Sequence, residues 1–64
     1  MPELVVYLLE GRSVEHKRAL VKDLTSAVVK NLGVPQESVT VSLVETARTD
    51  KAKGGVLFAD MKAG

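Results

Sequence analysis

Apolar residues run without interruption near the start of the chain. Residues 4–9 are aliphatic apart from Tyr7, and Glu10-Gly11 ends the run. A short run of this kind, rich in Val and bounded by a glycine, is typical of a β-strand whose two faces are both buried. We therefore predict a strand over residues 4–9.

The apolar pattern then changes to a helical repeat over residues 14–32. Its apolar members recur at spacings of three and four: Leu20, Val21, Leu24, Ala27 and Val28. Such a stripe indicates an amphipathic helix. Ser13 stands where an N-cap belongs, Gly33 stands at the first position beyond the helix and Pro35 follows, and these residue types commonly begin and end helices. The helix is expected to end near Leu32.

The second half of the chain predicts one more strand and a hairpin. In residues 39–45, apolar side chains occupy every second position from residue 39 to residue 43, and this period of two indicates a strand. Residues 46–53 are polar and predict a loop, whereas Gly54-Gly55 predicts a turn. Residues 56–58 are expected to form a short terminal hairpin strand, beyond which the tail is expected to fray.

A strand, a helix and a strand with short connections indicate a right-handed βαβ unit with parallel strands. The predicted fold class is α/β (α+β): a βαβ protomer with a parallel two-stranded sheet, one long helix and a short C-terminal hairpin, in a single domain over residues 1–64. One helix covers one face of this sheet, whereas parallel sheets are almost always covered on both. We expect another copy of the chain to cover the second face.

Composition leads to the same expectation. A chain of 64 residues buries only about 60% of the surface that it exposes when unfolded. It contains no Cys and one His, so neither a disulfide framework nor a Cys/His zinc site can stabilise it. Association of several copies of the chain is the remaining way to stabilise a fold of this size.

The balance of charges limits the classes of partner that we expect the chain to bind. Nine basic and eight acidic residues give a net charge of +1, which is too balanced for a nucleic-acid-binding surface. The apolar run over residues 4–9 is far shorter than the roughly 20 residues of a membrane span, and no secretory signal is evident. We expect a cytoplasmic protein that contacts neither nucleic acid nor membrane.

Pro2 is the unusual chemical feature. If Met1 is removed, the nitrogen of Pro2 becomes a secondary amine at the chain end, a base that no side chain supplies. Taken alone, a proline here is more often only the start of an edge strand. The single imidazole, His16, lies among charged residues and is interpreted as a solvated surface group.

Pro2 stands at a fixed distance from the run Leu-Glu-Gly-Arg-Ser at residues 9–13, which leads directly into the helix. This combination resembles the 4-oxalocrotonate tautomerase family. The match continues through the turn at residues 33–35, a second strand ending in Glu45 and the glycine pair at residues 54–55. It covers nearly the whole chain.

The resemblance implies an oligomeric tautomerase fold, usually a homohexamer built as a trimer of dimers, with no cofactor. It also implies that the N-terminal Pro2 lies in an apolar pocket at a subunit boundary and acts as general base. An α-amino group has a pKa of about 8, and apolar surroundings disfavour its protonated form. The base would take a proton from a small unsaturated 2-oxo or 2-hydroxy acid and return it further along the conjugated system.

Arg12 is the second candidate, because a guanidinium can hold a substrate carboxylate bidentately. The alternative is that Arg12 only satisfies the loop or pairs with Glu10. Leu9, beside it, is a further substrate-binding candidate.

Two positions depart from the family pattern. Thr40 stands where the best-known members have a second arginine, and Lys51 stands where they have a loop aromatic. Thr40 can donate only a neutral hydrogen bond to developing enolate charge. Arg48, Lys51 and Lys53 are candidates for the missing cation.

Three interpretations therefore remain open. The first is a tautomerase with altered substrate choice. The second uses Pro2 for hydration or dehalogenation of an unsaturated acid, with a carboxylate such as Glu45 or Asp50 activating water. The third is a non-catalytic subunit, or one chain of a hetero-oligomer whose partner brings the missing arginine.

Overall fold

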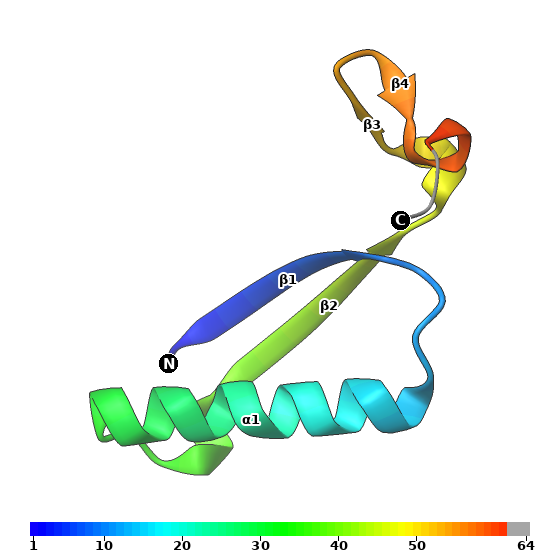
Figure 1. Ribbon diagram of the computed structural model, residues 1–64. Coiled ribbons are helices and arrows are strands. Elements are labelled where there is room, and N and C mark those ends of the chain that lie inside the picture. Colours follow the sequence, from blue (N-terminus) through cyan, green and yellow to red (C-terminus); the bar gives the residue numbers. More distant parts are fainter. Residues whose placement is uncertain (62–64) are drawn as a thin grey trace.

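The computed structural model of the chain describes residues 1–61. Figure 1 shows a helix lying along a pair of strands, with a small hairpin projecting beyond them. The helix and strands are β1 (Glu3–Leu9), α1 (Val14–Leu32), β2 (Thr40–Thr46), β3 (Ala52–Lys53) and β4 (Val56–Leu57). There are also three single 3-10 turns among the described residues: η1 (Gln36–Ser38) before β2, η2 (Arg48–Asp50) before β3 and η3 (Phe58–Asp60) after β4.

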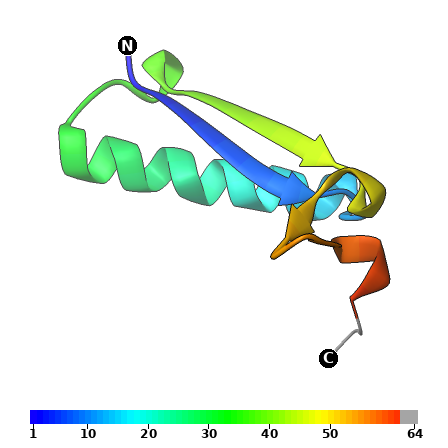
Figure 2. The same ribbon diagram turned by 90° about the horizontal axis from the view of Figure 1, so that it is seen from above.

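The two long strands pair in parallel, as the sequence predicts. Their register runs from Glu3 opposite Thr40 to Leu9 opposite Thr46. Helix α1 connects the end of β1 to the start of β2, and Figure 2 shows it lying alongside both strands. The βαβ unit is confirmed.

Helix α1 begins and ends at the predicted residues. The Ser13 hydroxyl accepts a hydrogen bond from the backbone N–H of His16 at 3.2 Å. At the other end, Gly33 adopts a left-handed conformation with φ of 66°, and its N–H donates to the Val29 carbonyl at 2.9 Å. These caps satisfy backbone groups that the helix itself leaves unpaired.

The two faces of the sheet differ in exposure. Leu4, Val6 and Leu8 alternate along β1 as half-buried residues on the face toward α1. Val5 and Tyr7 point to the other face and are 48% and 72% exposed. The prediction that both faces of the first strand are buried is therefore wrong for a single chain, because one helix covers only one of them.

None of residues 1–61 is fully buried in the single chain. The exposed apolar side chains include Val44 of β2, opposite Tyr7 in the register. Val5, Tyr7 and Val44 are called the open face of the sheet below. Exposed apolar side chains that gather on one face of a sheet commonly mark a protein interface.

The C-terminal segment is more ordered than predicted. Gly54 and Gly55, with φ of 62° and 83°, form a two-residue turn that pairs β3 with β4. Each strand is only two residues long, so Phe58 begins η3 and does not extend the hairpin strand. The predicted loop over residues 46–53 holds η2 and β3, and η3 replaces the start of the frayed tail, whose last three residues lie outside the described part of the chain.

Backbone hydrogen bonds close both the β3–β4 hairpin and the turn η2 before it. The N–H of Phe58 donates to the carbonyl of Lys51 at 2.8 Å, and the N–H of Asp50 donates to the carbonyl of Ala47 at 2.8 Å.

Within the described residues, no helix has the length and apolar character needed to cross a bilayer.

Candidate functional site

Pro2 and Thr40 meet at the start of the parallel sheet. The backbone N–H of Thr40 donates to the carbonyl of Pro2 at 3.1 Å. Pro2 is half-buried, whereas Thr40 is exposed. Met1 is 98% exposed, and while it is attached the nitrogen of Pro2 is a tertiary amide with no basic lone pair.

Arg12 lies at the opposite end of β1, in the connection to α1. Its Nη1 donates to the carbonyl of Leu9 over a long 3.4 Å. The side chain is exposed, and no carboxylate of residues 1–61 forms an ion pair with it. The loop contact considered from the sequence is present, whereas the pairing with Glu10 is not.

Arg12 borders a groove between β1 and the first turns of α1. The groove has a volume of about 290 Å³ and is lined by Leu8, Arg12, His16, Lys17 and Leu20. Its apolar surface comes from the two leucines, and its polar rim comes from the three basic side chains. We call it the Arg12 groove.

An ion pair neutralises the charge of Lys17. Lys17 Nζ lies 2.5 Å from Glu45 Oε1, with side chains 27% and 32% exposed. Lys17 therefore does not simply face water, as a charge on the polar side of a helix commonly does, because the parallel crossover sets the start of α1 against the end of β2. Glu45, a candidate for water activation, is engaged with Lys17 on the helix side of the sheet.

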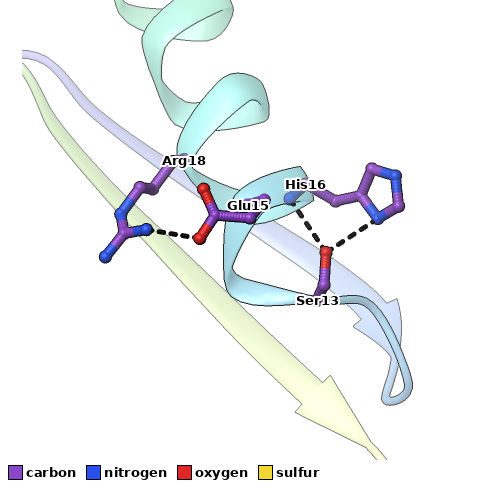
Figure 3. A network of polar contacts seen from close by, with 4 residues as sticks. All are labelled: Ser13, Glu15, His16 and Arg18. Carbon is purple, nitrogen blue, oxygen red and sulfur yellow. Dashed lines mark hydrogen bonds and ion pairs between the residues drawn. The ribbon is translucent and has the colours of Figure 1, made fainter.

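The first turn of α1 carries a second polar network, drawn in Figure 3. The Ser13 hydroxyl lies 3.0 Å from Nδ1 of His16, in addition to capping the helix. Arg18 Nη1 lies 2.7 Å from Glu15 Oε1 in a strongly exposed pair. His16 is exposed, as predicted, and its ring is held beside the cap.

Arg48 and Lys51 both gather around Phe58 in the C-terminal segment. Arg48 Nη2 donates to the Phe58 carbonyl at 3.2 Å. Lys51 Nζ lies 5.6 Å from the centroid of the Phe58 ring, within the range of a cation–π interaction. Both cations therefore already have partners within their own segment.

The predicted site residues form separate groups in one chain. Pro2 and Thr40 lie at the start of the sheet, and Leu9 and Arg12 lie at its far end. The seven residues of β1 between them span about 20 Å. A small substrate cannot reach from Pro2 to Arg12 within one copy, so a site that uses both needs a second copy.

Sequence reasoning missed Lys17 as a residue of the Arg12 groove, and it missed the ion pair of Lys17 with Glu45. A signal was available: the period of two in the second strand puts Glu45 on the same side as Val41 and Leu43, and this side faces the helix. No three side chains of the metal-ligating types gather in residues 1–61 to hold a metal ion.

Comparison with known proteins identifies the family. The family model described as Tautomerase enzyme matches residues 2–61. A probable tautomerase of Bradyrhizobium diazoefficiens is 41% identical over 63 residues, which are 98% of this chain and 94% of the relative.

Solved structures agree with this match. The crystal structure of a 4-oxalocrotonate tautomerase homologue is 49% identical and superposes with a TM-score of 0.90, covering 98% of this chain and 100% of the other. A heterohexamer 4-oxalocrotonate tautomerase from Chloroflexus aurantiacus is 32% identical, with a TM-score of 0.89 and coverage of 97% and 100%. The chain therefore belongs to the tautomerase family and has the fold of the 4-oxalocrotonate tautomerase homologues.

Proposed function

We propose that the chain is a cofactor-free tautomerase in which Pro2, freed of Met1, is the general base. The observation that carries the proposal is the hydrogen bond from Thr40 N–H to the Pro2 carbonyl at 3.1 Å. It holds Pro2 at the edge of the sheet through its carbonyl and leaves its nitrogen unused. Because Met1 is 98% exposed, its removal costs the fold no packing.

The proposed reaction moves one proton. The neutral amine of Pro2 takes the hydroxyl proton of a small unsaturated 2-hydroxy acid, and the C2–O bond becomes a carbonyl. The π electrons shift along the conjugated chain to a carbon, which receives the proton from the prolyl ammonium. The amine is neutral again at the end, and a well-placed base of this kind contributes about 100- to 10,000-fold.

Arg12 of another copy is the proposed partner of Pro2. Its guanidinium would bind the substrate carboxylate in a bidentate pair and so orient the acid toward the base. The separation of about 20 Å along β1 supports a shared site.

The open face of the sheet supplies apolar surface for this association, with Tyr7 72% exposed. We propose a homohexamer arranged as a trimer of dimers. The heterohexamer from Chloroflexus aurantiacus motivates a second arrangement, in which this chain assembles with a related chain.

The test combines mass, assembly and activity. Native mass spectrometry of the purified protein should give a hexamer of chains that lack Met1. These chains should ketonise phenylenolpyruvate or 2-hydroxymuconate, whereas Pro2→Ala should assemble normally and lose most of the activity. Full activity in chains that retain Met1, or in Pro2→Ala, would refute the proline base.

A further inference from the structure

His16 lines the Arg12 groove and has no part in the proposed reaction so far. The groove contains three basic side chains, and their partners within the chain differ. Lys17 is bound to Glu45, whereas Arg12 makes only its long 3.4 Å contact to the carbonyl of Leu9. His16 forms no ion pair in the described part of the chain. Arg12 and His16 are therefore the two basic groups of the groove that a ligand can engage.

The Ser13 hydroxyl holds the ring of His16 at one of its two nitrogens. It accepts the backbone N–H of His16 at 3.2 Å, and it lies 3.0 Å from Nδ1 of the ring. The hydroxyl has one hydrogen of its own, which it can donate to Nδ1, and Nε2 of the neutral imidazole then carries the ring hydrogen. Figure 3 shows this second nitrogen on the side of the ring away from Ser13.

The nearby carboxylates are occupied elsewhere. Glu15 is bound to Arg18 at 2.7 Å, and Figure 3 shows this pair turned away from the imidazole ring. Glu45 is engaged with Lys17. Neither carboxylate therefore takes the hydrogen of Nε2 from a ligand in the groove.

The contacts of His16 are internal to each copy. Arg12, Ser13 and His16 lie within five consecutive residues. Every copy therefore presents them together, whichever copy supplies Pro2 to the shared site.

We infer that His16 is a second substrate-binding residue, which donates its Nε2–H to the carboxylate that Arg12 binds. The two oxygens of a carboxylate offer about four acceptor sites, enough for a guanidinium and an imidazole at once. The other tautomer would turn the lone pair of Nε2 toward the carboxylate, so a bound anion favours the tautomer that Ser13 supports. The inference rests on the proposed function, because it concerns the carboxylate end of the same substrate.

The first test measures binding without turnover. Sorbate (hexa-2,4-dienoate) has a carboxylate on a conjugated chain but no 2-hydroxyl proton to lose, and it is titrated calorimetrically into the assembled protein lacking Met1. His16→Phe keeps an aromatic ring without a donor, and Kd should rise by about tenfold, as for the loss of a hydrogen bond to a charged group. His16→Gln keeps a donor and should stay within about threefold of the parent protein. Both variants retain the helix cap, which the backbone N–H makes.

The second test observes the ring directly. His16 is the single histidine of the chain, so its nitrogens give unambiguous signals in ¹⁵N NMR of histidine-labelled protein. The spectra are recorded at about pH 8.5, where a histidine is ordinarily neutral. Nε2 should have the shift of a protonated nitrogen and should move when sorbate is added, whereas Nδ1 should keep the shift of an acceptor. A ring that only supports the helix start would not respond to sorbate.

The outcomes separate the inference from the function beneath it. In turnover of phenylenolpyruvate, His16→Phe should lower kcat/KM by about tenfold, mainly through KM. Sorbate that does not bind, that binds equally to the parent protein and to His16→Phe, or that leaves Nε2 unchanged overturns the inference, and turnover by the parent protein would still support the tautomerase. If sorbate binding depends on His16 but neither phenylenolpyruvate nor 2-hydroxymuconate is turned over, the proposed function fails and the carboxylate contact stands.

Discussion

The ammonium group of Lys17 lies 2.5 Å from a carboxylate oxygen of Glu45, and this ion pair joins residues that are 28 positions apart in the chain. It ties the first turns of α1 to the end of β2. The connection that carries Arg12 joins β1 to α1, and its start is held by the Glu10 N–H, which donates to the Thr46 carbonyl at 3.0 Å. The ion pair therefore holds Lys17, one of the residues that line the Arg12 groove.

Loss of this ion pair should be measurable as lost stability. We expect Lys17→Met to lower the free energy of unfolding by about 1 kcal/mol, because the pair is only partly exposed. Arg18→Met breaks the strongly exposed pair with Glu15 and should cost less than about 0.5 kcal/mol. Urea unfolding at one fixed protein concentration measures both, and equal losses would show that burial of the Lys17 pair contributes nothing.

Arg12→Ala should weaken substrate binding. A hydrogen-bonded charge pair to a carboxylate contributes about 1.5 to 3 kcal/mol, so we expect kcat/KM to fall by about tenfold to a hundredfold, mainly through KM. Arg18→Ala removes the same type of side chain from the exposed Glu15 pair and should leave both constants near those of the parent protein. A fall of the same size in both variants would contradict a specific role for Arg12.

A shared site makes a complementation experiment decisive. Pro2→Ala and Arg12→Ala should each be nearly inactive or impaired as pure assemblies. After the two variants are unfolded, mixed in equal amounts and refolded, about a quarter of the sites should combine an intact Pro2 with an intact Arg12 from different copies. No gain of activity on mixing would mean that the two residues do not cooperate across copies.

The open face of the sheet should be required for assembly. Tyr7 is 72% exposed in the single chain, so Tyr7→Asp places a carboxylate on the surface that another copy is proposed to cover. We expect association to weaken by about a hundredfold or more, seen as smaller species in analytical ultracentrifugation. Tyr7→Phe keeps the apolar ring and should assemble normally; an unchanged oligomer in Tyr7→Asp would place the interface elsewhere.

The end of α1 depends on Gly33. Its φ of 66° is unfavourable for a residue with a Cβ, although nothing lies within 4 Å of the position that a Cβ would take. Gly33→Ala should therefore destabilise the protein by about 1 kcal/mol through backbone strain alone. Gly33→Asn should cost less, because asparagine tolerates this conformation; thermal unfolding of the three proteins at equal concentration compares them.

The elements of the fold follow from local patterns in the sequence. The spacing of apolar residues in α1, the cap residues Ser13 and Gly33, and the alternation in β2 act over a few residues each. The structure confirms the bounds of α1 and the parallel pairing, and it moves β2 by only one residue. Gly54-Gly55 predicted the turn, but not that only two residues on each side of it would pair.

Tertiary structure decided what comes together and what stays apart. Lys17 meets Glu45 because the crossover sets the start of α1 against the end of β2. A sequence pattern that spans a few residues does not relate two residues 28 positions apart. In the same way, Pro2 and Arg12 are close in sequence but lie at opposite ends of an extended strand, about 20 Å apart. The sequence by itself determined which residues carry the candidate chemistry, whereas the straight path of β1 decided that one copy cannot unite them.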